Sequence, residues 1–428
     1  KCVTVTASEV IVMLSLEEAR AAILQGVRAC TERESVPLVD AGGRYLADTP
    51  RARVDNPAFD NSAMDGYAVK LADLAAHDFR LPLHGESSCG QAPATLKPGT
   101  TMRIFTGAPL PAGADTVVIQ EDIHEQDGRI VFPRSIKAGQ HIRRRGEDFP
   151  AGHELLRPGQ RLNAWNLALL STAGIDKIDV FRRARVLVVA TGNELVAPGQ
   201  PLQPGQIYES NRLATLLQIR ALGAEAIDGG TVRDEPDALR ALLQKAGDYA
   251  DRTEARAAGQ GWPDGGFDFV ITSGGVSVGD HDLVKQVFAE IGEIHFWKVR
   301  IKPGKPIAFG RLGERTHFFA LPGNPVSSLV TFLLFVEPAL CAWHHASSGM
   351  IELAATASNG FRRRAGRTEF LRARLYSENG RLMAEALKGQ GSHQLRPMAD
   401  TNGFIRVEAE SDGFEAGAAV VAIPLFPG

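Results

Sequence analysis

Three stretches of this sequence combine a short apolar run with a loop of Gly, Ser, Lys or Pro, a pattern typical of anion-binding sites. They read FDFVITSGGVSVGDHD, KVRIKPGKPIAFG and FALPGNPVSS, and they lie between residues 267 and 328. A strand followed by glycines and the start of a helix brings free backbone N–H groups and the positive end of a helix dipole to one place. Loops of this kind gather at the carboxyl edge of a parallel sheet, so the sequence predicts an oxyanion site there.

The middle stretch supplies the positive charge that such a site needs. Alternation along one strand predicts Lys298, Arg300 and Lys302 on the same face. The competing interpretation is an ordinary solvated face, which is the commoner role of a charge run. Because these residues stand between two apolar strands and beside glycine loops, they also suit phosphate or a metal oxoanion.

Carboxylates follow several of the predicted strands. Glu194 comes after RVLVVATGN, Asp234 after AEAIDGGTVR, and Asp282 after SGGVSVGDH. Carboxylates that face phosphates are typical of Mg²⁺ sites, since Mg²⁺ takes one or two acidic ligands together with phosphate oxygens and water. Asp234 and Asp280 have a simpler alternative role as helix N-caps.

The two glycine turns exclude some functions. SGGVSVGD has neither the GxGxxG spacing nor the P-loop lysine, so a dinucleotide-binding fold and a nucleoside triphosphatase are disfavoured. The alternative for this turn is a flexible connection, which is the weaker interpretation because two such turns occur in one sheet. LPGNPVSS is equally consistent with a strand-to-helix turn that uses Ser or Asn as N-cap. The histidines show no triad pattern, because none stands near a G-x-S-x-G.

Two further polar stretches stand nearer the amino terminus. FDNSAMDGYAV (residues 59–69) packs Asp60 and other polar residues between apolar anchors, and RRRGED (residues 143–148) ends at Asp148. The first is equally well explained as an Asx-turn loop and the second as a surface charge cluster.

The elements that position these residues divide into several parts. Strands and helices alternate over residues 183–345, which predicts a doubly wound α/β domain with parallel strands. Residues 51–148 read as a β-rich insert domain, and residues 346–428 as a C-terminal small β-barrel. Residues 1–50, with an amphipathic helix over 16–29, and residues 149–182 are expected to form one discontinuous mixed linker domain. The polar residues 245–266 are interpreted as a surface excursion without a catalytic role.

Length and composition agree with a multidomain soluble protein. The chain has 428 residues, more than one core of roughly 250 to 300 residues would hold. With 44% hydrophobic residues, 23% charged residues and a net charge of -3, it shows no general attraction to nucleic acid or to an anionic membrane. The apolar run 10–16 lacks a basic flank and leads into a capping box of Ser15 and Glu18, and the run 329–343 is interrupted by Glu337 and Pro338, so neither is expected to be a signal peptide or a membrane span. Four widely spaced cysteines favour a reducing, cytoplasmic location.

Seven motifs in this order resemble the molybdopterin molybdenumtransferases, the family of MoeA and the gephyrin E domain. They are FDNSAMDGYAV, TGAPLPAGADTVV, RRRGEDF, ATGNELVAPGQPL, SGGVSVGDHD, KPGKP and LPGNPVSS, and they span nearly the whole chain. The resemblance implies a homodimer of four-domain subunits that inserts molybdenum from molybdate into adenylylated molybdopterin, with Mg²⁺, and releases AMP.

The resemblance also implies which residues form the site. Matched acids expected in catalysis are Asp60, Asp148, Glu194, Asp234 and Asp282, of which Glu194, Asp234 and Asp282 are expected to hold the metal. Expected substrate-binding residues are Ser273, Gly274, Gly275, Ser277, Lys298, Lys302, Pro322, Gly323, Asn324, Pro325, Arg372 and Ser392. Lys298, Lys302, Arg372 and Ser392 are the expected molybdate ligands, and Asp60 and Asp148 are expected to reach the α/β domain of the partner subunit.

Two alternative functions fit parts of the same pattern. A molybdopterin adenylyltransferase uses a similar α/β domain but needs ATP, and the additional β-rich modules argue against it. A gephyrin-like scaffold would bind a peptide at its dimer surface and would not need the matched acids and lysines. Expected partners are adenylylated molybdopterin, molybdate, a second copy of the chain, and the adenylyltransferase or molybdoenzyme-maturation proteins.

Overall fold

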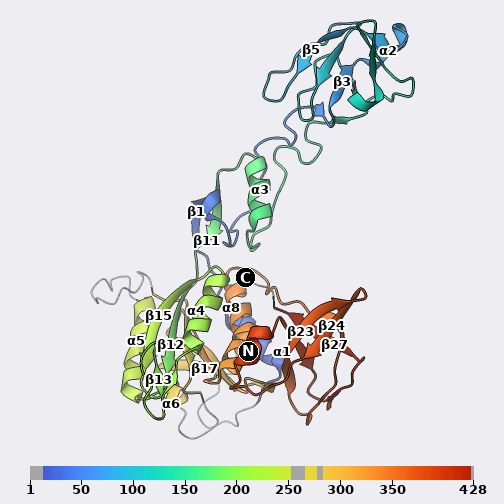
Figure 1. Cartoon of the computed structure of the whole chain (residues 1–428). Coiled ribbons are helices and arrows are strands. Elements are labelled where there is room, and N and C mark those ends of the chain that lie inside the picture. Colours follow the sequence, from blue (N-terminus) through green and yellow to red (C-terminus); the bar gives the residue numbers. More distant parts are fainter. Residues whose placement is uncertain (1–12, 252–265, 277–282, 426–428) are drawn as a thin grey trace. The chain divides into compact units, whose positions relative to one another are not determined.

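The computed structural model describes residues 13–251, 266–276 and 283–425, with the backbone only at residues 248–251 and 297. The chain forms two compact units (Figure 1). Unit 1 comprises Lys1–Arg33, Gly43–Tyr45 and Phe181–Gly428, and unit 2 comprises Glu34–Gly42 and Leu46–Val180. Ser277 and Asp282, expected in the site, lie outside the described residues, as does Asp280.

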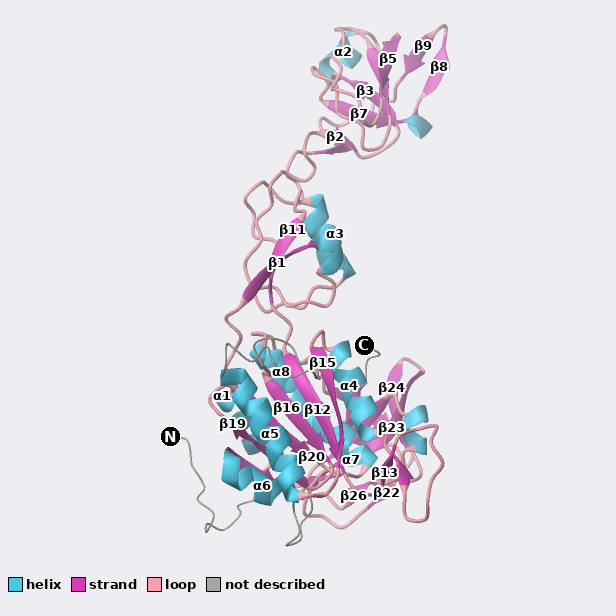
Figure 2. Cartoon of the chain, turned by 90° about the vertical axis from the view of Figure 1, so that its left-hand side faces the viewer, coloured by secondary structure: helices cyan, strands magenta, loops and turns pink. Residues whose placement is uncertain are grey.

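Unit 1 is built on a six-stranded sheet with the order β15-β12-β16-β20-β19-β17 (Figure 2). The strands are β12 (Arg185–Thr191), β15 (Glu225–Val232), β16 (Phe269–Ser273), β17 (Gly292–Lys298), β19 (Pro306–Leu312) and β20 (Thr316–Leu321). The predicted α/β domain is confirmed, and β15, β12, β16 and β20 run parallel. β19 is antiparallel to both of its neighbours, so the expectation of parallel strands fails at this side of the sheet. The reason is that β19 and β20 are joined by a tight hairpin, which reverses the chain without a crossover helix.

Helices cover both faces of this sheet. They are α4 (Asn211–Ala221), α5 (Pro236–Asp251), α6 (Leu283–Ile291), α7 (Pro325–Thr331) and α8 (Glu337–Trp343). α5 and α6 share one face, where Leu239, Leu243, Val287 and Phe288 pack with Leu187 and Val189 of β12. Because α5 continues to Asp251, the predicted excursion is helical at its start, and residues 252–265 lie outside the described residues.

A single helical run extends from Pro325 to Trp343 and continues through Glu337 and Pro338, which interrupt only the apolar run of the sequence. The π-helix Phe332–Val336 joins α7 to α8. Pro338 has no N–H for the carbonyl four residues before it, that of Leu334, and Arg20 Nε donates to that carbonyl at 3.1 Å instead. Among the described helices, this run passes a test for a membrane span by length and hydropathy alone. Since 78% of this segment is buried inside the structure, it has the environment of a core helix.

The first helix, α1 (Leu16–Gly26), begins at the predicted capping box. Glu18 N–H donates to Ser15 Oγ at 3.1 Å, and Ser15 N–H donates to the Glu18 carboxylate at 2.7 Å. The helix contacts α8, and Arg20 binds the π-helix, so it belongs to unit 1. The expected assignment of residues 1–33 to the linker domain therefore differs from the packing, because the buried face of α1 is covered by unit 1.

The C-terminal part of unit 1 is a closed barrel of five strands. They are β21 (Leu353–Ala357), β23 (Thr368–Glu378), β24 (Arg381–Ala386), β25 (Gly403–Val407) and β27 (Ala419–Pro424), closed by the pairing of β23 with β25. Two-residue strands β22 (Phe361–Arg362) and β26 (Gly413–Phe414) pair beside it. β18 (Ile301–Lys302) joins β23 in parallel and so attaches the α/β part to the barrel, as expected for a small β-barrel that completes the fold.

Unit 2 consists of a β-rich insert and a hydrophobic core formed by the two chain segments that precede and follow this insert. Residues before and after the insert share a core, among them Leu46, Ala52, Phe149 and Leu170, with β1 (Arg33–Pro37) paired to β11 (Lys177–Phe181) and helix α3 (Ala164–Thr172). The insert has a four-stranded sheet of β5 (Leu83–Ser87), β6 (Thr101–Ile104), β3 (Gly66–Val69) and β7 (Thr116–Ile119). A second sheet contains β4 (Arg80–Leu81), β9 (Arg129–Val131) and β8 (His124–Gln126), and α2 (Leu71–Ala76) follows β3.

Two buried histidines are expected to make the stability of unit 1 depend on pH. Burial lowers the pKa of His317 to about 4 and that of His344 to about 4. Their unfolded pKa is about 6.5, so between these values the unfolded chain binds protons that the native state does not. Their contribution is therefore complete above about pH 6.5 and is lost as the pH falls towards 4, by roughly 3 kcal/mol per histidine.

Guanidinium unfolding at several pH values between 7.5 and 4.5 measures this loss. His317→Gln removes one of the two groups and should make the decline about half as steep, whereas His124→Gln, on the exposed strand β8, should leave it unchanged. An equally steep decline in the His317 variant would show that other groups carry the pH dependence.

Candidate functional site at the carboxyl edge of the sheet

Two predicted acids stand at the ends of neighbouring strands. β12 and β15 pair in parallel up to Thr191 and Val232, so the residues that follow them leave the sheet side by side. Asn193 N–H donates to the Asp234 carboxylate at 3.3 Å, and Asp234 N–H donates to Asn193 Oδ1 at 3.2 Å. Helix α5 starts later, where Leu239 N–H donates to the carbonyl of Glu235, so Asp234 is not its N-cap. The alternative role of Asp234 as a cap is therefore wrong.

Glu194 projects from the same edge. Its side chain is exposed, and its carboxylate lies close to Gly192, where a Cβ would be 2.6 Å from Glu194 Oε2. Gly192 has a φ of +154°, a backbone conformation that favours glycine. Glu194 and Asp234 thus present exposed carboxylates from adjacent strand ends.

The glycine turn after β16 requires its glycines for steric reasons. Ser273 is buried, and Gly274 has a φ of +93°, in the left-handed region. A Cβ at Gly274 would lie 2.4 Å from the Thr191 carbonyl oxygen, and one at Gly275 would lie 2.9 Å from Thr191 Oγ1. This hydroxyl is buried and has no hydrogen-bond partner among the described residues. The turn therefore keeps the backbone close to the end of β12.

The LPGNP loop lies beside that turn. A Cβ at Gly323 would be 3.6 Å from Gly274 Cα, and Asn211 at the start of α4 donates from Nδ2 to the Gly323 carbonyl at 2.7 Å. Pro322 is buried, and Pro325 is the first residue of α7. Asn324 occupies the N-cap position, but its side chain makes no capping hydrogen bond, so the expected role as an ordinary N-cap is not the one it has.

The lysines come from two different sheets. Lys298 is the last residue of β17, whereas Lys302 belongs to β18, which pairs with the barrel. The expectation that Lys298, Arg300 and Lys302 share one face of a strand is therefore wrong, because the chain leaves the first sheet at Val299. β17 runs in the same direction as β20, so Lys298 still lies at the carboxyl edge. The KPGKP loop packs on α7, since a Cβ at Gly304 would lie 2.4 Å from Thr331 Cγ2.

The barrel brings Ser392 to the same helix. Val326 N–H, in the first turn of α7, donates to the Ser392 carbonyl at 3.1 Å. This contact joins the QGSHQL loop of the barrel to the LPGNP loop of the α/β part, although 66 residues separate the two positions in the sequence.

Arg372 supports the loop that carries Ser392. Its side chain is 1% exposed, and its guanidinium donates to the carbonyls of Gly389, Gly391 and Gln394. Burial lowers its pKa from the usual value. Its Nε has no partner among the described residues. In this arrangement the guanidinium holds the loop backbone, which is a different role from the direct contact with molybdate that the resemblance implies.

One charged residue of this region was not predicted from the sequence. Glu369 is 3% exposed, and its carboxylate binds Lys302 Nζ at 2.8 Å and Arg363 at 3.5 Å. A signal was present, since alternation along TEFLRARL places Glu369 on the same face as the core residues Leu371 and Ala373. An acid on the inward face of a strand needs a buried partner.

The two acids from the insert lie in unit 2, on segments that contact each other. β2 (Asn61–Ser62) pairs with β10 (Ile142–Arg143), which brings FDNS next to RRRGED. Asp60 accepts from Arg145 N–H at 2.8 Å and from the Arg144 guanidinium at 2.6 Å, and these hydrogen bonds lower its pKa. Asp148 accepts from Asn56 Nδ2 at 2.9 Å. In RRRGED, the Arg144 guanidinium and the Arg145 N–H thus already bind an acid of their own unit.

The donor set at the sheet edge fits Mg²⁺. Glu194 and Asp234 are carboxylates that follow the adjacent strands β12 and β15, and Mg²⁺ binds through one or two carboxylates, substrate phosphates and water. Among the described residues, groups of three or more Cys, His, Asp or Glu that could hold a metal alone are absent. Two carboxylates are within the number of acidic ligands that Mg²⁺ takes in addition to phosphate oxygens and water.

Comparisons with known proteins cover the chain from end to end. Residues 14–174 match the MoeA N-terminal region (domain I and II), residues 187–342 a probable molybdopterin binding domain, and residues 354–425 the MoeA C-terminal region (domain IV). A molybdopterin molybdenumtransferase from Haemophilus influenzae is 38% identical over 417 residues, or 96% of this chain and 98% of the relative. A molybdopterin molybdenumtransferase 2 from Mycobacterium tuberculosis is 35% identical over 95% of this chain and 98% of its own length.

Solved structures agree with these matches. A molybdopterin biosynthesis MoeA protein from Pyrococcus horikoshii has a TM-score of 0.76 and 31% identity, and the alignment covers 97% of this chain and all of that one. Another solved structure, of a molybdopterin biosynthesis MoeA protein from Pyrococcus horikoshii OT3, has a TM-score of 0.79 and 27% identity, and the alignment covers 96% of this chain and all of that one. Matches of this extent, together with the carboxylates, glycine turns and LPGNP loop at the sheet edge, show that the chain belongs to the MoeA family of molybdopterin molybdenumtransferases.

Proposed function

We infer that this protein is a transferase of molybdenum cofactor biosynthesis, which inserts molybdenum from molybdate into adenylylated molybdopterin and releases AMP. The observation that best supports this function is that three loops with expected substrate-binding residues meet at α7. The LPGNP loop begins the helix, the KPGKP loop packs against it, and the Ser392 loop accepts a hydrogen bond from its first turn. Glycine backbone, lysines and two carboxylates thus occur together, as a phosphate-bearing substrate and a dianion require.

We assign the substrate contacts as follows. The turn of Ser273, Gly274 and Gly275 and the LPGNP loop bind the pterin phosphates through close backbone approach. Lys298, Lys302 and the Ser392 loop bind molybdate, because ammonium groups lower the repulsion between the dianion and the phosphates. Arg372 acts on the same site by fixing the backbone around Ser392. No protein nucleophile is required.

We propose that Glu194 and Asp234 bind Mg²⁺, with Asp282 as the third acid implied by the resemblance. When bound, the ion would polarise the phosphoanhydride bond that is broken when AMP leaves. Asn193 fixes the Asp234 carboxylate through its N–H and leaves the rest of that carboxylate for the ion.

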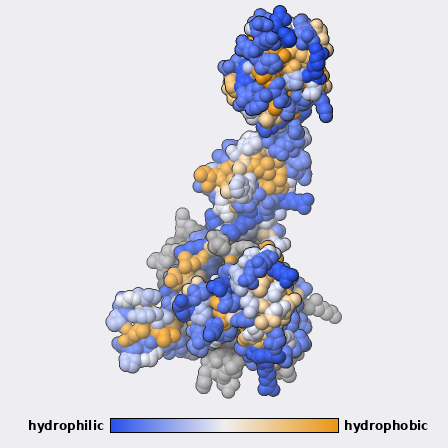
Figure 3. Space-filling view, turned by 45° about the vertical axis from the view of Figure 1, so that its right-hand side comes forward, coloured by the Kyte–Doolittle hydropathy of each residue, from blue (hydrophilic) through white to orange (hydrophobic). Residues whose placement is uncertain are grey.

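We further propose a homodimer in the cytoplasm. Apolar side chains reach the surface of both units (Figure 3), and in unit 1 the exposed ones include Leu213 and Leu217 on one face of α4, with Ile207 and Tyr208 on the short strand β14 (Ile207–Tyr208). A second copy of the chain covers such a patch in a self-complementary contact. Asp60 and Asp148 then belong to the site of the partner subunit, as the resemblance implies. Cys30, Cys89 and Cys341, the cysteines that the structure describes, form no disulfide with one another, as we propose for a reducing compartment.

The function is tested by incubating the protein with adenylylated molybdopterin and Mg²⁺ and measuring AMP with and without molybdate. We expect AMP to appear only when molybdate is added. Release of AMP without molybdate, or consumption of ATP with free molybdopterin, would favour the adenylyltransferase. A protein inactive in both assays would instead be a scaffold.

A further inference from the structure

A buried carboxylate connects the predicted molybdate site to the C-terminal barrel. Glu369 lies on β23 and is 3% exposed, whereas its partner Lys302 on β18 has a side chain that is 45% exposed. The two are directly in register in the parallel pairing of β18 with β23, and Nζ lies 2.8 Å from Oε1. The ammonium of Lys302 is thus anchored on one side and open to solvent on the other.

The second partner of this carboxylate fixes it from the protein side. Arg363 has a side chain that is 4% exposed and lies 3.5 Å from Glu369 Oε2. Its guanidinium also donates to the backbone carbonyls of Arg367 and Glu408. Arg363 is therefore held in place by the barrel, and the carboxylate cannot turn away from Lys302 without leaving a buried arginine uncompensated.

The charges of this cluster do not cancel. One carboxylate faces two cations, Lys302 and Arg363, so the three groups together carry one excess positive charge. Of the two cations only Lys302 is exposed, and the excess charge is available to an anion at that side chain. A lysine side chain loses rotamer entropy when it binds an anion. Because the ion pair with Glu369 already restricts the Lys302 side chain, less entropy is lost when the anion binds.

We propose that Glu369 is a positioning residue for molybdate binding. It holds the Lys302 ammonium toward the incoming oxyanion without contacting the anion itself. The inference rests on the proposed function, in which Lys302 binds molybdate. Lys302 and Glu369 are brought together only by the β18–β23 pairing, so the barrel contributes to the affinity for molybdate through this contact as well as through Ser392.

The test is the AMP-release assay with the full-length chain at varied molybdate concentration. Glu369→Gln keeps the shape of the side chain but removes its charge, and we expect it to raise the KM for molybdate about tenfold while kcat changes less than about twofold. Glu369→Asp retains the charge and should recover most of the affinity. In a Lys302→Met background the Gln substitution should have no further effect, since the carboxylate acts through the lysine.

The matched control is Glu385→Gln, which removes an exposed ion pair with Arg374 on the same barrel and should leave both constants unchanged. A purely structural role of Glu369 would lower the amount of active protein, and hence the apparent kcat, at an unchanged KM for molybdate. That result overturns the proposal. So does a further rise in KM when Glu369→Gln is added to the Lys302→Met variant. If the Gln variant does not fold, Lys302→Met decides, because a KM for molybdate that stays unchanged without the ammonium overturns the proposal. Absence of molybdate-dependent AMP release in the unmodified protein would overturn the proposed function instead.

Discussion

Replacing Asp234 by Asn is expected to lower the rate of AMP release by about 100-fold or more, the scale observed when one charge-stabilising group is removed from an active site. The Asn side chain can still accept the hydrogen bond from Asn193 N–H, so the strand ends should keep their arrangement. What is lost is the negative charge that we propose binds Mg²⁺ opposite the substrate phosphates.

The rate should be measured over a range of Mg²⁺ concentrations, together with the thermal unfolding midpoint. We expect the variant to need more Mg²⁺ for half of its maximal rate and to unfold at the same temperature as the original protein. Asp237→Asn provides the control, because Asp237 lies in the first turn of the same helix and pairs with Arg240 on the surface. Normal AMP release by the Asp234 variant would refute the metal-binding role.

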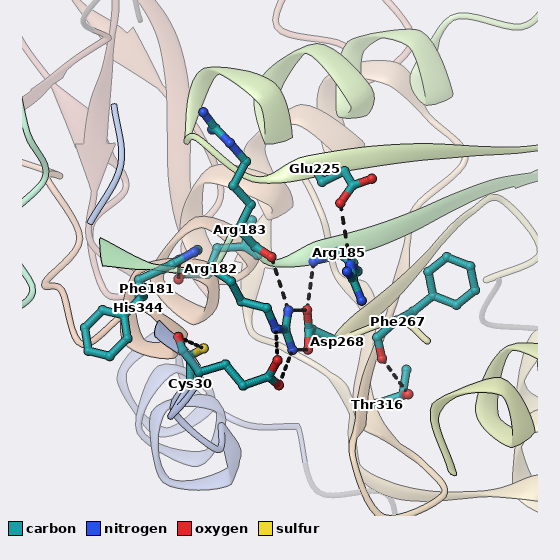
Figure 4. Close-up of polar contacts among 12 residues, drawn as sticks. Cys30, Phe181, Arg182, Arg183, Arg185, Glu225, Phe267, Asp268, Thr316 and His344 are labelled. Carbon is teal, nitrogen blue, oxygen red and sulfur yellow. Dashed lines mark hydrogen bonds and ion pairs between the residues drawn. The ribbon is translucent and has the colours of Figure 1, made fainter. Parts of the chain in front are cut away.

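Replacing Asp268 by Ala is expected to lower the free energy of unfolding of unit 1 by about 3 kcal/mol, the lower end of the usual cost of removing one partner of a buried ion pair, because this pair is partly exposed. Figure 4 shows the Asp268 carboxylate between Arg182 and the backbone of Arg185. Both carboxylate oxygens accept from the Arg182 guanidinium, at 2.7 and 2.8 Å, and one also accepts from Arg185 N–H at 2.8 Å.

Arg182 is poorly able to compensate for that loss. Its side chain is 18% exposed, and its guanidinium carbon lies over the Trp343 ring, 4.9 Å from the ring centroid. Burial opposes its charged form, but the hydrogen bonds to Asp268 and Glu32 raise the pKa of Arg182. Without Asp268 the remaining acid, Glu32, is largely exposed and pairs more weakly.

Chemical unfolding followed by circular dichroism measures this effect. Glu225→Ala is the matched control, because Glu225 pairs with Arg185 at 3.6 Å on an exposed surface and should change stability by less than about 1 kcal/mol. A similarly small loss of stability in the Asp268 variant would mean that the ion pair of Asp268 with Arg182 does not stabilise the chain segment that leads into β12.

The sequence alone predicted the elements whose causes are local. The capping box of Ser15 and Glu18 starts α1, and the apolar run before Gly274 forms β16, because both depend on residues a few positions apart. The positions of Glu194 and Asp234 at strand ends follow from the same patterns, since parallel strands end at a common edge. The full set of motifs also indicated the family.

The tertiary structure decided the contacts between residues far apart in the chain. The pairing of Lys302 with Glu369, the hydrogen bond from Val326 to Ser392, and the burial of Arg372 against its loop have no local pattern. Each depends on how the barrel packs against the α/β part, which is set by the sum of many apolar contacts and by strand register. The sequence therefore indicated which residues carry the charge at this site, whereas only the packing determined which of those charges are anchored and which remain available to the substrate.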